Sequence, residues 1–183
     1  YTTGLITKKW EHGRFTDPYI LEDLQDYGIL IDTLECATNW EDLPRVHEHV
    51  RAVIKSRPRT VCMTHMSHCY PQGANLYFIF IAKMDRDEFL EFHRGVLDAI
   101  QASGATMSHH HGIGKMTAPW LEGRLGSNEL EVSRALKRHF DPKNVLNPGG
   151  TLALDLPDDN LPGRLRAGRR CLFATEDVRT ARQ

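Results

Sequence analysis

The sequence has almost no net charge, since 23 Lys and Arg residues stand against 24 Asp and Glu residues. A chain balanced in this way has no long-range field that would attract nucleic acid or an anionic membrane surface. Binding to polyanions, nucleic acid included, is therefore not expected. With 183 residues, 40% of them hydrophobic, the chain still has the size and composition of a folded domain with a real core.

Cysteine is scarce and shows no paired pattern. The four cysteines include no C-x-x-C pair, and neither a signal peptide nor a long apolar run accompanies them. We therefore expect reduced thiols and a cytoplasmic, intracellular location. The chain opens on Tyr1 and runs directly into ordinary domain sequence, so we expect it to be part of a longer protein.

Two common catalytic motifs are also missing. The segment Gly112-Ile113-Gly114-Lys115 lacks the first glycine and the final Ser or Thr of a phosphate loop, so nucleotide hydrolysis is not indicated. The sequence contains no Gly-x-Ser-x-Gly nucleophile elbow, and no cysteine has an evident partner base. Redox or flavin chemistry is the class that survives these absences.

Hydrophobic periodicity predicts an α+β fold with an antiparallel sheet. From residue 29 onward the predicted order is strand, helix, strand, strand, helix, which is most of a ferredoxin-like unit. The predicted elements are a helix at 17–27 with Asp17 as N-cap, a strand at 29–36, a helix at 40–56 capped by Asn39, strands at 60–67 and 75–84, and a helix from Asp85 or Asp87 to Gly104.

A second helical region follows, from residue 119 to residue 139, and Asp141-Pro142 ends it. From Pro157 onward the sequence is rich in Pro, Gly and Arg and has little periodicity, so we predict a surface tail. The expected apolar anchors of the helical region are Leu130, Val132, Leu136 and Phe140.

The most informative segment is the run of three histidines, His109 to His111, between a predicted helix and a Gly-x-Gly turn. Imidazoles gathered on a tight backbone can bind an anionic group or move protons near neutral pH. A solvated polar loop is the simpler explanation. Tyr77 is predicted to lie on the sheet face opposite Leu76 and Phe78. Its phenol, with an ordinary pKa of about 10, would need such imidazoles to make its anion accessible.

A metal site is the alternative use of these histidines. His65 and His68 lie three residues apart in the predicted hairpin, and with His109 to His111 they offer enough imidazole for a transition metal. No cysteine or carboxylate spacing completes a known ligand pattern, so we expect no bound metal.

Several motifs, in order and spacing, resemble the alkyldihydroxyacetonephosphate synthase group of the FAD-linked oxidase superfamily (the vanillyl-alcohol oxidase type), which also contains D-lactate, glycolate and D-2-hydroxyglutarate dehydrogenases. The histidine run is the most specific of them. The motifs are Tyr19-Ile20, Thr33-Leu34-Glu35, Trp40, Gly73-x-x-Leu76-Tyr77-Phe78, Ser108-His109-His110-His111-Gly112-Ile113-Gly114-Lys115 and Phe140-Asp141-Pro142-x-Asn144-Val145-Leu146-Asn147-Pro148-Gly149.

The resemblance implies a division of the chain and a cofactor. Residues 1–104 would be the C-terminal part of a substrate-binding cap, residues 105–150 the histidine loop and a helical segment that returns to the flavin, and residues 151–183 a tail. An N-terminal domain outside this chain would hold most of the FAD. The implied activity is the exchange of an acyl for an alkyl group, from acyl-dihydroxyacetone phosphate and a fatty alcohol, through an adduct at flavin N5.

The resemblance also implies roles for single residues. Tyr77, His109, His110 and His111 match the catalytic positions of the group, and we weight His111 most. His109, His110 and Asn147 match positions next to the cofactor.

The sequence departs from its relatives in two places. The dehydrogenases typically carry His-x-Gly-x-Gly-Asn-x-His and a later Glu-His-Gly, which supply metal ligands. Here Tyr77 replaces the second strand histidine and His110 replaces the glutamate, so most of those ligands are lost. Leu21 stands where the synthase group has a substrate-binding arginine, and Arg14 is a candidate to replace it.

Two alternatives to the synthase reaction remain open. One is FAD-dependent dehydrogenation of a D-2-hydroxy acid such as lactate or glycolate, which the same flavin and base would serve. The other is a stand-alone α+β module that binds a ligand without catalysis. For the full enzyme we also expect a small-molecule substrate, a homodimer and peripheral association with a membrane.

Overall fold

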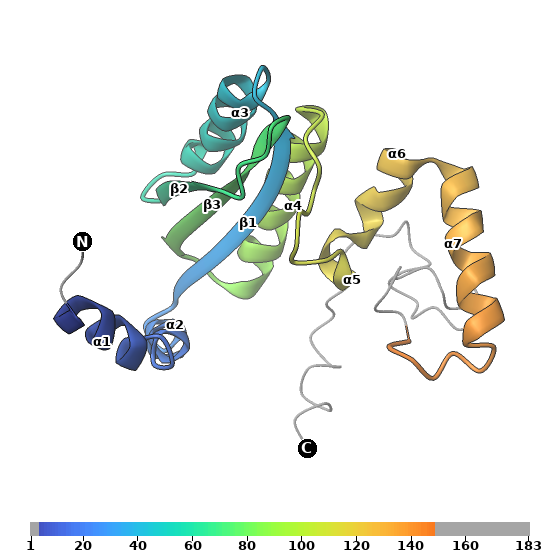
Figure 1. Cartoon of the computed structure of the whole chain (residues 1–183). Helices are drawn as coiled ribbons and strands as arrows, with labels where there is room; N and C mark the ends of the chain where they lie inside the picture. The colour runs from blue at the N-terminus through green and yellow to red at the C-terminus, as the bar shows by residue number, and fades with distance from the viewer. Residues whose placement is uncertain (1–3, 149–183) are drawn as a thin grey trace.

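The computed structural model of the chain describes residues 4–148, and Figure 1 shows how they are arranged. Three antiparallel strands form one sheet. Some helices pack against this sheet, and others precede or follow it along the chain. The elements are α1 (Gly4–Gly13), α2 (Asp17–Gln25), β1 (Ile29–Asn39), α3 (Leu43–Ser56), β2 (Val61–Ser67), β3 (Gly73–Lys83), α4 (Arg86–Ala102), α5 (Gly114–Thr117), the 3-10 turn η1 (Ala118–Trp120), α6 (Leu121–Leu125) and α7 (Ser127–Phe140).

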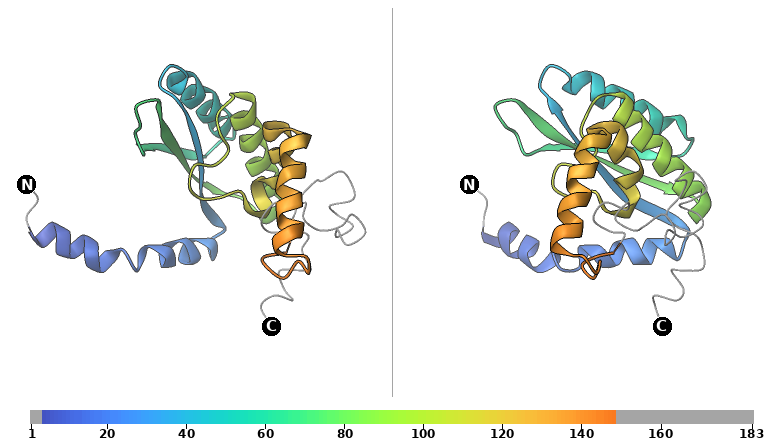
Figure 2. Two further views of the ribbon diagram at one scale, coloured as in Figure 1. Left: turned by 45° about the vertical axis from the view of Figure 1, so that its right-hand side comes forward. Right: turned by 90° about the vertical axis from the view of Figure 1, so that its right-hand side faces the viewer.

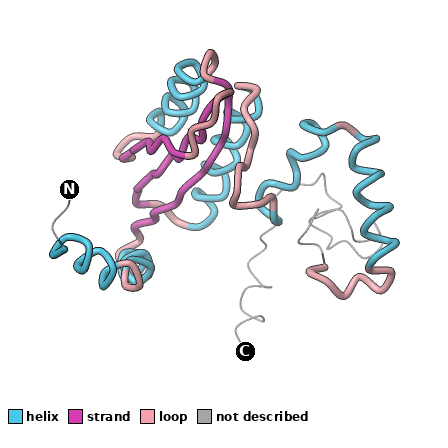
Figure 3. The backbone as a smooth tube through the Cα atoms, in the orientation of Figure 1, coloured by secondary structure: helices cyan, strands magenta, loops and turns pink. Residues whose placement is uncertain are grey.

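The sheet has the strand order β1-β3-β2, and both pairs are antiparallel. The predicted α+β class and the strand, helix, strand, strand, helix order are therefore confirmed. Figure 3 shows the three strands together, with the helices joined to them by short loops. The long central strand β3 lies between the other two, which fixes the side-chain direction along its whole length.

One face of the sheet and the two helices α3 and α4 enclose the core. Phe78 and Phe80 of β3 are fully buried there, against Val50 of α3 and Leu97 of α4. Burial of each such side chain contributes about 2 kcal/mol. The two helices therefore cover this face of the sheet.

The opposite face, called the polar face after Glu35 and Tyr77, also carries apolar residues such as Ile79 and Ile81. Alternation along β3 buries Leu76 and Phe78 under the helices and places Tyr77 on the other side, where it is partly exposed. The predicted direction of Tyr77 is thus confirmed. Glu35 of β1 is its direct partner in the ladder, so the two side chains leave the same face.

The start of α3 corrects one prediction. Asn39 does not cap this helix, because it is still in β1 and pairs with Gly73 of β3. Asp42 is the N-cap, and a proline in the first turn starts the helix. The N-cap of α2 is likewise Thr16 and not Asp17. By contrast, Asp85 caps α4 as predicted, since its side chain accepts a hydrogen bond from the backbone N–H of Glu88.

The region predicted as one helix from 119 to 139 is broken. Gly126 has φ of 88°, which ends α6 before α7 begins. Among the four expected anchors only Leu130 is buried, where α6 packs on α7. Val132, Leu136 and Phe140 are 62%, 55% and 77% exposed, so their prediction as core residues is wrong. Asp141 does end the helix, as its C-cap.

The helix α1, which was not predicted, lies away from the sheet in both views of Figure 2, and α2 connects it to the start of β1. None of the helices within residues 4–148 has the length and hydrophobicity that a bilayer crossing requires. Cys36, Cys62 and Cys69 are free thiols. Cys171 and the predicted tail at 151–183 lie outside the described residues.

Candidate active site

The segment between α4 and α5 brings the histidines to the sheet. It runs beside β1 in Figure 1 and pairs with the free edge of this strand at one point. There the backbone N–H of Thr106 donates to the carbonyl of Ala37, at 2.9 Å. Ala105 and Met107 are buried in the core on either side of that contact. The chain that follows is thus anchored directly above the polar face of the sheet.

A single carboxylate oxygen then holds the backbone of the histidine run. Oε1 of Glu35 accepts hydrogen bonds from the backbone N–H groups of His109, His110 and His111, at 2.8, 2.8 and 2.7 Å. It also accepts one from the hydroxyl of Ser108, at 3.0 Å. Such a cradle of consecutive N–H groups is a favourable site for an anion.

Glu35 is ionised despite its position. Its residue is only 3% exposed, and burial by itself raises the pKa of the carboxyl group. The hydrogen bonds from the backbone of the three histidines and from Ser108 outweigh burial and lower the pKa of Glu35 to about 2. The site therefore contains a fixed negative charge at neutral pH.

The second oxygen of Glu35 faces side chains. Nδ2 of Asn75 donates to Oε2 at 3.1 Å, and Nδ1 of His110 lies 3.0 Å from the same oxygen. In contrast, Nδ1 of His111 is 3.9 Å from Oε1, which is too far for a hydrogen bond. Among the three histidines, His110 alone joins its ring directly to this carboxylate.

Tyr77 meets two of the imidazoles. Its hydroxyl forms a short hydrogen bond with Nε2 of His110 and lies 3.2 Å from Nε2 of His111. Burial, the charge of Glu35 and hydrogen bonding to Glu35 raise the pKa of Tyr77 above its ordinary value. The imidazole contacts expected for Tyr77 are present, yet within this chain the residue is a neutral phenol at pH 7.

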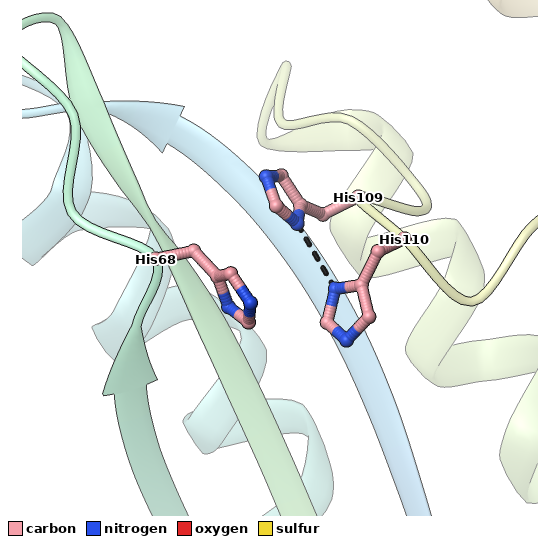
Figure 4. A group of neighbouring side chains, drawn as sticks. All are labelled: His68, His109 and His110. Carbon is pink, nitrogen blue, oxygen red and sulfur yellow. Dashed lines mark hydrogen bonds between the residues drawn. The ribbon is translucent and has the colours of Figure 1, made fainter.

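His109 turns to the opposite side of the loop. Its Nε2 lies 3.0 Å from the hydroxyl of Tyr70, and its Nδ1 lies 3.0 Å from Nδ1 of His110. Figure 4 shows His68, which follows β2, directed toward both of these rings. One aromatic and polar cluster is thus formed by His68, Tyr70, His109 and His110.

Two sets of residues have the spacing of metal ligands. Their nitrogen and oxygen atoms lie within 4.8 Å of one another. His65, expected as a member of an alternative metal site, belongs to neither set. The sets are His68, His109 and His110, and Glu35, His110 and His111.

An open pocket of about 460 Å³ lies beside this cluster on the polar face of the sheet. Its size is within the range of small-molecule sites. Tyr77 and His111 contribute to its wall. The other residues that line it are Thr33, His65, Ser67, His68 and Ile79.

The structure therefore brings together four of the five predicted site residues, which are Tyr77, His109, His110 and His111. Asn147 is exposed in the loop after α7, and no hydrogen bond between residues 4 and 148 joins it to the histidines. Leu21 lies on α2 and is 38% exposed. The guanidinium of Arg14 stacks on Trp10 and Phe15 of its own segment, at 4.9 and 5.2 Å from the ring centroids.

Glu35, Asn75 and Tyr70 were not predicted as site residues. Glu35 had one sequence signal, since it is a carboxylate inside an otherwise apolar strand and such a residue needs a partner. For Asn75 and Tyr70 no local pattern stood out, because their partners are 40 and 39 residues away in the sequence.

Comparisons with known proteins show the family to which the chain belongs. The family of FAD linked oxidases, C-terminal domain, matches residues 4–151. Alkyldihydroxyacetonephosphate synthase of Dictyostelium discoideum is 30% identical over 151 residues, which cover 77% of this chain and 24% of that protein. Glycolate oxidase subunit GlcD of Bacillus subtilis is 46% identical over 52 residues, or 28% of this chain and 11% of that protein.

A solved structure of an alkyldihydroxyacetonephosphate synthase has the same fold, with a TM-score of 0.54 and 25% identity over 77% of this chain and 23% of that chain. The chain thus spans about a quarter of the length of the synthases that it matches. Since the family match extends over most of the sequence, this chain belongs to the FAD linked oxidases, C-terminal domain family, whose cofactor is FAD.

Proposed function

We propose that this chain supplies the proton-transfer wall of an FAD-dependent enzyme of the alkyldihydroxyacetonephosphate synthase type. The observation that carries the proposal is the position of the Tyr77 hydroxyl, which lies between Nε2 of His110 and Nε2 of His111 beside an open pocket. The proposed substrates are acyl-dihydroxyacetone phosphate and a fatty alcohol. The similarity to synthases along 77% of the chain supports this choice.

The residues of the pocket fit FAD as one wall of its site. Imidazole and phenol groups offer hydrogen bonds and flat apolar surfaces to a heteroaromatic ring, and the pocket has room for a ring edge. The sequence contains no glycine-rich phosphate loop, so another part of the protein would bind the dinucleotide. From the family resemblance we further propose that His109, His110 and Asn147, which lie outside the wall of this pocket, also face the ring. When bound, FAD supplies the redox-active ring on which the reaction depends.

The residues of this chain would move the proton. Tyr77 would take a proton from the substrate carbon while its own hydroxyl proton passes to a neighbouring imidazole. One proton then leaves the substrate and one arrives on histidine, so the phenol is restored. General acid and base groups placed in this way contribute about 10²- to 10⁴-fold to a rate.

Dehydrogenation of a D-2-hydroxy acid is the second candidate. Two observations favour it, namely the 46% identity to glycolate oxidase subunit GlcD over 52 residues and the metal-like spacing of His68, His109 and His110. The same phenol and imidazoles would then take the hydroxyl proton of the substrate, and FAD would supply the electron acceptor for the oxidation.

One experiment separates the two reactions. The protein as its gene encodes it, loaded with FAD, is given acyl-dihydroxyacetone phosphate with a long-chain alcohol, and in parallel D-lactate or glycolate with a dye acceptor. Ether-lipid product without dye reduction supports the synthase proposal. Dye reduction without ether product would contradict the synthase proposal and support dehydrogenation of a hydroxy acid instead. Ligand binding by a protein that retains no FAD and catalyses neither reaction would favour a stand-alone binding module.

For the full protein we also propose a cytoplasmic location, a homodimer and peripheral contact with a membrane. Exposed apolar side chains on α1 support an interaction surface there, since Leu5, Ile6 and Trp10 are 79%, 60% and 62% exposed. Light scattering and co-sedimentation with lipid vesicles would test the last two points. A monomer that stays in the supernatant would contradict both.

A further inference from the structure

We propose that Glu35 is the positioning residue of this site, which fixes the histidine loop with one oxygen and selects the tautomer of His110 with the other. The role rests on the proposed function, since it explains which imidazole receives the Tyr77 proton. It does not depend on the identity of the substrate. Glu35 itself touches neither the pocket nor its contents, because its side chain is 2% exposed and it is absent from the pocket wall.

The first part of the role is mechanical. Oε1 accepts four hydrogen bonds, one from the side-chain hydroxyl of Ser108 and three from the consecutive backbone N–H groups of residues 109–111, and these partners lie 73 to 76 residues from Glu35 in the sequence. A free loop has many backbone conformations, and each of them would orient the three imidazoles differently. By holding three successive N–H groups on one atom, Glu35 selects one of these conformations.

The second part concerns a single proton. An ionised carboxylate only accepts hydrogen bonds, whereas a neutral imidazole has one donor and one acceptor nitrogen. Nδ1 of His110, 3.0 Å from Oε2, must therefore carry the hydrogen. Nε2 of His110 is then the acceptor nitrogen, and the hydroxyl of Tyr77 donates to it.

The same reasoning assigns the other two histidines. The only hydrogen of the Tyr77 hydroxyl is used toward His110, so Nε2 of His111 at 3.2 Å must be a donor to the phenol oxygen. Nδ1 of His109 faces the protonated Nδ1 of His110 at 3.0 Å, so it can only accept, and its Nε2–H points to Tyr70. One set of tautomers is compatible with all these contacts, with the Nδ1–H of His110 shared between Oε2 of Glu35 and Nδ1 of His109.

The assignment gives different tasks to two neighbouring histidines. His110 receives the proton of Tyr77 at Nε2, and the imidazolium that forms keeps its Nδ1–H bond to the negative Glu35. His111 donates to the phenol oxygen and stabilises the negative charge that develops there. The arrangement of carboxylate, imidazole and hydroxyl in series is the logic of a catalytic triad, here with a phenol at the end.

The test uses the FAD-loaded protein as its gene encodes it, labelled with ¹⁵N in the histidine side chains. In the unchanged protein we expect the ¹⁵N shifts of His110 to show a protonated Nδ1, and the backbone amides of residues 109–111 to exchange more slowly with solvent than those of residues 112 and 113. In Glu35→Gln, which has nearly the same shape but presents an NH₂ group, His110 should switch to the Nε2–H form. Glu48→Gln, on the exposed surface of α3, is the matched control and should leave both readouts unchanged.

Kinetics adds a readout that a merely structural role would not give. We expect kcat of Glu35→Gln to fall about 100-fold or more with little change in KM, because a histidine in the wrong tautomer lowers kcat in a catalytic triad. In Glu35→Ala the exchange of amides 109–111 should rise about tenfold or more, because each lost hydrogen bond to a charged group is worth about 1.5 kcal/mol or more.

The outcomes separate this proposal from the proposed function. An Nε2–H tautomer of His110 in the unchanged protein, or unprotected amides at 109–111, would overturn the role of Glu35 even if no variant folds. Protected amides and the Nδ1–H tautomer in a protein that catalyses neither reaction would leave the role of Glu35 standing and remove the proposed function instead.

Discussion

Glu35 and Tyr77 are direct partners across the ladder of β1 and β3, and His110 bridges the two side chains on the polar face of the sheet. The strand register thus fixes the separation of the carboxylate and the phenol, since opposite residues on one face have their Cβ atoms about 5 Å apart. A rigid sheet is a more accurate support for such a series than a loop would be.

Removal of the phenol hydroxyl should abolish most of the reaction. We predict that Tyr77→Phe lowers kcat by about 10²- to 10⁴-fold, the range of a general acid or base, and keeps the fold, because the ring remains. Turnover and the absorbance of bound flavin are the measurements. Unchanged turnover with flavin still bound would show that Tyr77 moves no proton.

His110 and His111 should not be equivalent. The family resemblance favoured His111, whereas the contacts make His110 the proton acceptor of Tyr77 and the partner of Glu35. We predict that His110→Ala loses more kcat than His111→Ala, and that a Tyr77→Phe background removes most of this difference, since the three groups act as a unit. Equal losses in the two single variants would contradict the division of tasks.

Glu35 should make the fold sensitive to strong acid. Its pKa falls from an ordinary value of 4.5 to about 2 in the folded chain, so its stabilisation is complete above pH 4.5 and is lost as the pH falls toward 2. This shift corresponds to about 3 kcal/mol. Denaturant unfolding at a series of pH values should show this loss. Glu35→Gln should be less stable at neutral pH, and its free energy of unfolding should change less between pH 4.5 and 2.

A second group provides the internal control for this measurement. Burial lowers the pKa of His93 from 6.5 to about 4, so the unfolded chain binds a proton there at a pH where the folded chain does not. The free energy of unfolding should therefore also decrease as the pH falls from 6.5 to 4, and this decrease should be the same in Glu35→Gln. A change in the upper window would mean that the substitution had disturbed the core around α4.

The turn that carries Tyr70 depends on Gly73. A Cβ atom at this position would lie 2.0 Å from the backbone oxygen of Thr38, so we predict that Gly73→Ala costs about 2 kcal/mol or more. Gly95 in α4 has no atom within 4 Å of such a Cβ, and Gly95→Ala should stabilise the chain by about 0.5 to 1 kcal/mol. Thermal unfolding of both variants tests the contrast, and a stable Gly73→Ala would show that the β1 end can move.

Chelation tests the other use of the histidines. The ring nitrogens of His109 and His110 already contact Tyr70, Tyr77 and Glu35, so we predict that dialysis against a chelator leaves turnover unchanged. Zinc bound by His68, His109 and His110 would have to displace these contacts, so added zinc should inhibit. If turnover is lost on dialysis and restored by zinc, the site is a metal centre and the dehydrogenase proposal gains support.

Local patterns predicted the elements well wherever the pattern and the packing agreed. Aromatic and β-branched residues on either side of a turn-like segment predicted the hairpin of β2 and β3. Asp85 was a correct cap because its side chain reaches a free N–H group of the first helical turn. The single helix predicted after residue 118 was wrong in two respects, because the chain breaks at Gly126 and most of the expected apolar anchors are exposed. Periodicity identifies an apolar stripe, but it does not show that another element lies against it, and three of the four anchors on α7 are exposed.

For the site, the sequence by itself determined which groups are available. Three adjacent histidines must lie close together whatever the fold, and alternation in a strand was enough to direct Tyr77 away from the core. Only the tertiary structure decided how these groups are paired. The direction of each imidazole depends on hydrogen bonds to Glu35 from residues more than 70 positions away, and such long-range contacts leave no local pattern because they exist only once β1, β3 and the histidine loop have come together.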